Sequence, residues 1–79
     1  MARSRPSKEW QLRVRGILKA ELARRQLTYK DLAQRLEAMG VKENERNIAN
    51  KIGRGTFTAV FFFQCMEAIG VHTLHLNGH

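Results

Sequence analysis

The chain has 79 residues, of which 43% are hydrophobic and 27% charged, with 14 Lys and Arg against 7 Asp and Glu. This length allows one domain with a small core, because chains of this size bury only about 60% of the surface that they expose when unfolded. The single cysteine, Cys65, excludes an internal disulfide and fits the reducing cytoplasm. No apolar run is long enough to span a bilayer, and the first residues lack a hydrophobic signal core.

The net charge of +7 is unevenly distributed along the chain. Residues 1–35 carry ten basic and three acidic side chains, so they hold the whole excess, and residues 36–79 are balanced. A basic surface on a small domain raises the local concentration of a polyanion and speeds encounter with it. Nucleic acid is the commonest such partner, and an acidic membrane surface is the next.

Residues 1–7 are expected to form a flexible basic arm that contains Arg3, Arg5 and Pro6. Paired arginines in such an arm can enter a narrow minor groove, and they can also contact phosphates without reading sequence. An ordinary frayed terminus is the alternative. The remaining residues, 8–79, are expected to form a single domain.

A first helix is predicted over residues 8–25. Its apolar residues keep the 3.6-residue spacing of one helical face and are expected to face the core: Trp10, Val14, Ile17, Leu18 and Leu22. An amphipathic membrane helix would also combine Trp with a basic face. We favour the soluble helix, because the apolar stripe has the width that a helical core requires.

The stretch from Leu27 to Gly55 predicts two short helices joined by a turn. Thr28 is a good N-cap for a helix starting at Tyr29, and Gly40 is expected to end it in the left-handed conformation. Asn44 can cap the second helix, over residues 44–54. Its apolar positions place these side chains inside: Ile48, Ala49 and Ile52.

The second of these helices is expected to turn a polar stripe outward. The stripe consists of Arg46, Asn47, Asn50, Lys51 and Arg54. Arg can form two hydrogen bonds with guanine, Asn can do so with adenine, and Lys and Arg also bind phosphates. A solvated polar face is the alternative for any one residue, but the set of five on a basic chain favours contact with nucleic acid.

A last helix is predicted over residues 59–69, capped by Thr58. Phe61, Phe62 and Phe63 are consecutive, so their directions spread over about 200° of the helix and one core surface cannot cover all three. Phe62 is expected to face inward. Val60, Phe61 and Phe63 are then expected to form the interface of a homodimer. The alternative is that the first helix or the tail covers them.

The tail after Gly70 alternates apolar and polar residues, so residues 71–76 predict either a short helix or an extended strand. Three histidines and Cys65 match no zinc spacing, so no metal site is expected. The chain offers no nucleophile–base pair, no Gly-rich phosphate loop and no paired carboxylates. We therefore expect no enzymatic activity, no cofactor and no small-molecule ligand.

The stretch from Leu27 to Gly55 resembles the lambda-repressor-like helix-turn-helix class of the Cro and Xre type, in its "LT..DLA..L" helix and its terminal "RG". The link LEAMGVKENERN is about three residues longer than the usual compact turn. The whole chain also resembles an uncharacterised bacterial family of short domains with an "RG.F.A.FF.QC.EAIGV" signature. The first resemblance implies an all-α fold of four or five helices, and the second leaves function unassigned.

The helix-turn-helix resemblance implies which residues contact DNA. Its base-reading positions correspond to Glu45, Arg46, Asn47, Asn50 and Lys51. Its phosphate-binding positions correspond to Thr28, Tyr29 and Lys30 at the start of a helix. The basic residues that flank these positions complete the expected phosphate set: Arg3, Arg5, Lys42 and Arg54.

Together these features predict a small sequence-specific protein that binds double-stranded DNA as a homodimer and regulates transcription, in the cytoplasm at the nucleoid. It would read the major groove with the helix over residues 44–54. The alternative is a protein-interaction adaptor or a nonspecific nucleoid-associated protein whose working surface is the patch from Phe61 to Phe63. A helix-turn-helix that binds RNA is a further alternative.

Overall fold

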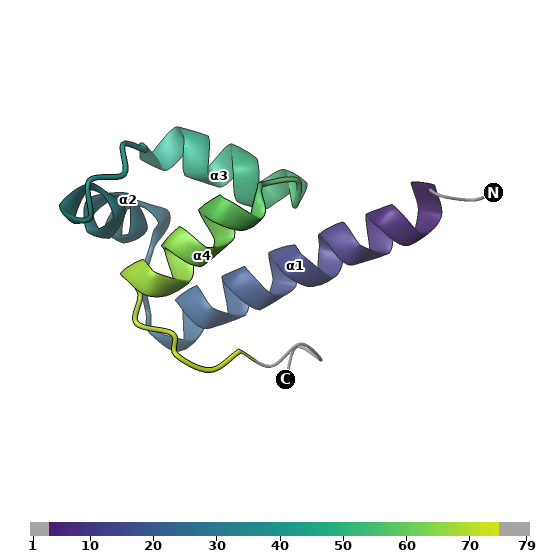
Figure 1. Ribbon diagram of the computed structural model, residues 1–79, viewed down its shortest axis with the longest axis horizontal. Helices are drawn as coiled ribbons and strands as arrows, with labels where there is room; N and C mark the ends of the chain where they lie inside the picture. The colour runs from purple at the N-terminus through teal and green to yellow at the C-terminus, as the bar shows by residue number, and fades with distance from the viewer. Residues whose placement is uncertain (1–3, 75–79) are drawn as a thin grey trace.

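The computed structural model describes residues 4–74, with side chains from residue 7 onward. This part of the chain is entirely helical between its loops, which confirms the predicted all-α class (Figure 1). Its four helices are α1 (Ser4–Arg24), α2 (Tyr29–Ala38), α3 (Glu45–Arg54) and α4 (Ala59–Ala68). None of them combines the length and apolar character that crossing a bilayer requires.

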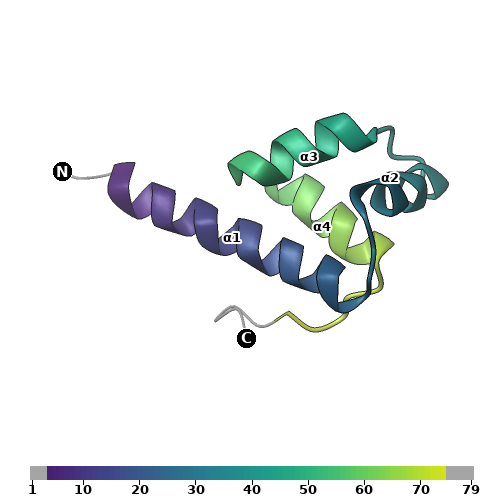
Figure 2. The same ribbon diagram turned by 180° about the vertical axis from the view of Figure 1, so that it is seen from behind.

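The long helix α1 carries the other three along its C-terminal part. Figures 1 and 2 show α3 and α4 on the same side of α1, with α2 at the end away from the N-terminus; α1 packs mainly on α3, and α2 packs on both α3 and α4. The N-terminal turns of α1 extend beyond this body in both views.

The helix boundaries follow from caps that the local sequence encodes. Thr28 and Asp31 form a reciprocal capping box at the start of α2, with N–H···O distances of 3.1 and 2.9 Å. Thr58 caps α4 by accepting from the Phe61 N–H at 3.0 Å. Both caps confirm the predicted helix starts.

Three helices end in the same hydrogen-bonded turn. After α2, Gly40 has φ 86°, and the Val41 N–H donates to the Leu36 carbonyl at 2.9 Å. The equivalent left-handed residue is Gly70 after α4 and Gln26, with φ 56°, after α1. The apolar residue that follows each turn folds back against the core. These residues are Leu27, Val41 and Val71.

All four helices contribute to one core. Its fully buried side chains are Leu18, Leu32, Leu36, Ile48, Ile52 and Cys65. Phe61, Met66 and Ile69 of the last helical segment are also buried, and Glu21 is the one buried charged residue among those described. The predicted inner positions Ile48 and Ile52 are thus confirmed.

The first helix differs from its prediction at its N-terminal end. It begins at Ser4 and not at residue 8, so residues 4–7 of the predicted flexible arm are helical. Pro6 fits there because the first four N–H groups of a helix have no helical acceptor. Trp10 is 59% exposed and does not join the core, because α1 runs past the helices that would cover it.

The described part of the tail is neither helix nor strand. Residues 71–74 are irregular, and Val71 and Leu74 pack partly buried against the core. The rest of the segment for which helix and strand were both considered, His75 and Leu76, lies outside the described residues.

Candidate nucleic-acid interface

Helix α3 is held at both ends, which fixes the direction in which its side chains point. The Asn44 side chain accepts a hydrogen bond from the Asn47 N–H at 2.8 Å and begins the helix. Gly55 ends it in the left-handed conformation, with φ 69°, and its N–H lies 3.1 Å from the carbonyls of Lys51 and Ile52. Ile48 and Ile52 are fully buried beneath it.

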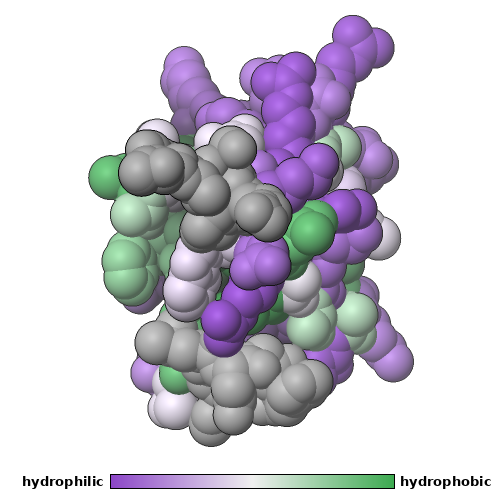
Figure 3. All heavy atoms as spheres, turned by 90° about the vertical axis from the view of Figure 1, so that its right-hand side faces the viewer, coloured by the Kyte–Doolittle hydropathy of each residue, from purple (hydrophilic) through white to green (hydrophobic). Residues whose placement is uncertain are grey.

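The opposite face of α3 is open to solvent. Its exposed residues are Glu45, Arg46, Asn47, Asn50 and Arg54. Figure 3 shows hydrophilic side chains rising from the top of the molecule, where Figure 1 places α3. This face offers guanidinium and amide groups, which can form paired hydrogen bonds with base edges.

Lys51 lies at the edge of this face and has partners within the protein. Its ammonium forms an ion pair with Glu43, whose side chain is only 10% exposed. The ammonium also sits 4.7 Å from the centroid of the Phe61 ring. Lys51 is therefore tied to the link before α3, and its positive charge is partly neutralised there.

Glu43 was absent from the predicted site, yet it sets the electrostatics below α3. The Glu43 side chain points from the link into the protein. Glu43 precedes Lys51 by eight positions and lies outside α3, so the spacing of residues within one helix does not reveal the pair. Burial, followed by the Glu43 carboxylate, raises the pKa of the Cys65 thiol to about 12, while the Lys51 charge acts in the opposite direction. Cys65 is thus a neutral core residue.

The start of α2 carries the predicted phosphate ligands Thr28, Tyr29 and Lys30. Thr28 and Lys30 are exposed and Tyr29 is half-buried. The hydroxyl oxygen of Thr28 already accepts from the Asp31 N–H. The hydrogen bond from the Thr28 N–H, followed by that with the Thr28 side chain, lowers the pKa of Asp31, so a carboxylate accompanies this helix start.

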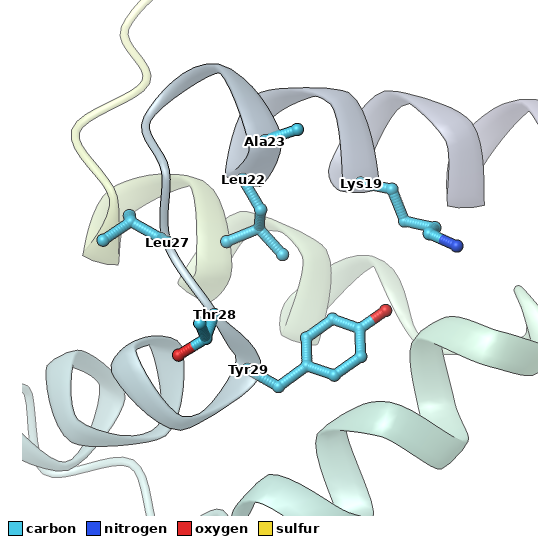
Figure 4. Close-up of a pocket in the computed structure, with 6 residues that line it drawn as sticks. All are labelled: Lys19, Leu22, Ala23, Leu27, Thr28 and Tyr29. Carbon is cyan, nitrogen blue, oxygen red and sulfur yellow. The ribbon is translucent and has the colours of Figure 1, made fainter.

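A cavity of about 300 Å³ separates this helix start from α1. Figure 4 shows Lys19 of α1 and Tyr29 of α2 with their polar ends on the same side of the cavity, and Leu22 and Leu27 behind them. Lys19 was not among the predicted site residues, because nothing in the local pattern of α1 distinguishes it from other exposed lysines. It brings an exposed cation to the same flank as Tyr29.

The other predicted phosphate ligands are spread more widely. Lys42 and Arg54 are exposed at the two ends of α3. Arg3 lies outside the described residues, and Arg5 lies in α1 with its side chain outside them. Arg24 and Arg25, at the end of α1, both pair with Glu21.

The predicted dimer interface needs one correction. Phe61 is 4% exposed and belongs to the core, whereas Phe62, predicted to face inward, is half-buried. The reason is that Phe61, Cys65 and Ile69 recur every four residues and form the buried side of the last helical segment. Val60 and Phe63 are 66% and 67% exposed and keep the open position that was predicted.

Within the described residues, no cluster of His, Cys, Asp and Glu side chains has the arrangement of a metal site. The molecule is thus a small four-helix domain with one polar helix face, a basic flank and an exposed apolar edge on α4. The chain belongs to a family described as a domain of unknown function (DUF6471), whose model matches residues 10–74. No curated protein and no solved structure matches it.

Proposed function

We propose that this protein binds double-stranded DNA, as a helix-turn-helix of the lambda-repressor-like type, and regulates transcription. The observation that supports this most is the division of α3 into two faces. Ile48 and Ile52 are 0% exposed on one face. The other face is exposed along its length and carries Arg46, Asn47, Asn50 and Arg54.

The dimensions of α3 suit the major groove. Its 10 residues span about 15 Å, and a capped helix of that length fits a groove about 12 Å wide. Asn47 and Asn50 lie three positions apart on one face, so both can meet adjacent base edges. We assign base reading to Arg46, Asn47 and Asn50, with Glu45 beside them at the helix start.

Lys51 has a different role in this proposal. Its ion pair with Glu43 directs the ammonium toward the link and away from the centre of the outer face. It contributes charge at the edge of the groove. Phosphates on either side are then available to Lys42 and Arg54 at the ends of α3, and to Lys19, Tyr29 and Lys30 beside the cavity.

A homodimer completes the proposal. Val60 and Phe63 are three positions apart on α4 and both are exposed, so they form one apolar edge. Two copies joined through this edge would present two α3 helices to half-sites about 34 Å apart, one turn of DNA. A two-fold symmetric binding site is the corresponding expectation.

The test is selection of binding sequences from a randomised duplex library at about 0.15 M salt, followed by affinity measurements on the enriched site. Asn50→Ala is expected to cost about 1–3 kcal/mol on that site and little on random DNA. Gln34→Ala, an exposed amide on α2, is the matched control and should change neither. Equal losses on both DNAs for Asn50→Ala would contradict base reading.

The second candidate is a protein-interaction adaptor, favoured by the exposure of Val60 and Phe63. It predicts that Phe63→Ser abolishes capture of a partner protein while DNA affinity stays unchanged. Phe61→Ser is unsuitable for this test, because Phe61 is a core residue whose loss unfolds the domain.

A further inference from the structure

An apolar groove lies between α1 and the start of α4, on the flank opposite the Lys19 cavity. It has a volume of about 290 Å³ and is lined by Val14 and Ile17 of α1 and by Phe57, Ala59 and Phe62. The rings of Phe57 and Phe62 stack in parallel at 6.1 Å between centroids and form one wall. An exposed apolar groove in a small domain usually marks a surface that another molecule covers.

Trp10 lies on the same face of α1 as this groove but outside it. Positions 10, 14 and 17 follow the i, i+4, i+7 spacing of one helical face, so Trp10 stands one turn before Val14. Its side chain is 59% exposed, and the Arg13 guanidinium sits 4.6 Å from its ring centroid. The ring is therefore open to solvent on the side of α1 that carries Val14 and Ile17.

We propose that the groove receives Trp10 of a second copy of this chain, in a symmetric dimer whose two α1 helices cross in antiparallel directions. This deepens the homodimer of the proposed function and is independent of DNA binding. With a two-fold axis near Arg13 and Val14, Trp10 of each copy lies opposite Ile17 of the other. Positions 10 and 17 of one helix are seven helical steps, or about 10 Å, apart, so both grooves fill at once.

The size of the exposed surface supports a second copy as the occupant. An aromatic side chain buries about 150–250 Å², and Trp10 and Phe63 are 59% and 67% exposed. The Phe63 ring is 5.9 Å from that of Phe62, so the exposed edge with Val60 continues the groove wall. Two copies would bury on the order of 500 Å² through these four side chains alone, about half of the ~1,000 Å² that a specific interface needs, and the covered groove walls add to this area.

Figure 3 looks along α1 from its N-terminal end. Apolar side chains are visible at the edge of this view that corresponds to the front of Figure 1, where α4 lies, and also on the other half of the view. Of the exposed apolar residues, Val60 and Phe63 lie on α4, the helix that also supplies Ala59 and Phe62 to the groove. None of the groove-lining residues belongs to α3, so a second copy in the groove and DNA on α3 would use different residues.

The salt dependence of binding distinguishes self-association from DNA binding. The crossing would bring the Arg13 side chains of the two copies near one another, and like charges repel less when salt screens them. Self-association is therefore expected to strengthen as salt rises. DNA binding weakens under the same change, because it releases counterions.

Trp10 is the only tryptophan, so its fluorescence reports directly on this contact. The full chain without DNA is diluted across its dissociation range while sedimentation gives the mass, and acrylamide quenching gives the access to Trp10. The expected result is that dimer formation shifts the emission to shorter wavelength and protects the ring from acrylamide. The two curves should share one midpoint.

Two variants test the two halves of the contact. Trp10→Ala should raise the dissociation constant of the dimer at least about tenfold by sedimentation. Leu12→Ala is its matched control, since Leu12 is 53% exposed on the opposite side of α1, and it should dimerise as the unchanged chain does. Ala59→Glu places a carboxylate in the groove at a helix start that tolerates it, and Trp10 should stay accessible at every concentration.

Three outcomes would overturn the proposal. A dimer whose Trp10 stays exposed joins the copies through another surface. A shielded Trp10 in the monomer means that the chain covers the ring itself. A chain that remains monomeric at millimolar concentration does not use the groove for a second copy. Each result leaves the DNA-binding measurement with Asn50→Ala unaffected, so the two proposals fail separately.

Discussion

The carbonyl oxygen of Gln11 lies 2.5 Å from the position that a Cβ atom on Gly55 would occupy. The end of α3 therefore touches the backbone of α1 at a point where only glycine fits. Gly55 also has φ 69°, a conformation that other residues adopt only with strain. This contact sets the distance between the long helix and the proposed reading helix.

Gly55→Ala is expected to destabilise the domain by about 3 kcal/mol, from the left-handed backbone and the clash with Gln11 together. That is a large fraction of the ~5–15 kcal/mol available to a small domain, and the midpoint of thermal unfolding should fall by more than ~10 °C. Gly53→Ala is the matched control, because nothing lies within 4 Å of its Cβ position. It should leave stability unchanged or raise it by up to ~1 kcal/mol. Equal midpoints for the two variants would contradict the close approach.

The features that could be predicted from the sequence depend on neighbours within about four positions. The caps at Thr28, Asn44 and Thr58 and the turn at Gly40 are of this kind, because each hydrogen bond closes within one helical turn. The outward direction of α3 followed from the same local spacing. These local features were enough to predict the all-α class and most residues of the polar face of α3.

The features that sequence reasoning missed depend on where distant segments end. Trp10 has core spacing, but its burial depends on how far α3 and α4 extend along α1. Phe61 and Phe62 are adjacent on the helix, and only the packing of α4 against the rest of the core decides which of them is buried. Lys51 pairs with Glu43, which lies in the irregular link before α3, and the periodicity of the sequence does not predict the path of that link.

Glu21 makes the domain sensitive to acid. Burial alone would raise the pKa of Glu21, but the hydrogen bonds from Arg25 and Arg24 outweigh it and hold the pKa below 4.5. A carboxyl group whose pKa is lower in the folded state stabilises the fold above its unfolded pKa. This stabilisation is lost as pH falls from about 4.5 through the folded value.

The measurement is the free energy of unfolding by denaturant between pH 7 and pH 3, for the unchanged chain and for Glu21→Gln. Arg24 is 55% exposed, so water weakens its interaction with Glu21. We therefore expect Glu21→Gln to lower the free energy of unfolding by about 1 kcal/mol at pH 7. The two proteins should converge toward pH 3. A gap that persists at low pH would show that shape and packing, and not charge, make Glu21 important.

Cys65 should resist thiol reagents as long as the protein is folded. Burial, and then the Glu43 carboxylate, raises the pKa of this thiol to about 12, and only the thiolate reacts. Alkylation at pH 8 is therefore expected to follow the unfolding equilibrium, with the rate rising in step with denaturant. Rapid labelling without denaturant would contradict burial of the sulfur.

The same raised pKa predicts a loss of stability in base. The unfolded thiol releases its proton near pH 9.0 and the folded one near pH 12, so the folded state holds the proton over that range. Stability from this group is complete below pH 9 and falls as pH rises toward 12. Cys65→Ala should flatten that part of the pH profile, and an equal decline in both proteins would contradict this role of the thiol.

The pair of Glu43 and Lys51 offers a test of how charge is distributed beneath α3. Glu43→Gln removes the carboxylate that holds the Lys51 ammonium, so the ammonium becomes available to a phosphate. If α3 binds DNA as proposed, the slope of log affinity against log salt should steepen by about one unit. Stability should fall by about 1 kcal/mol, because Lys51 is 43% exposed and water replaces part of the lost interaction.

Glu67→Gln, an exposed site on α4, makes the same change in net charge and should leave the salt slope unchanged. An equal change for both variants would assign the effect to net charge alone and leave Lys51 without a part in binding.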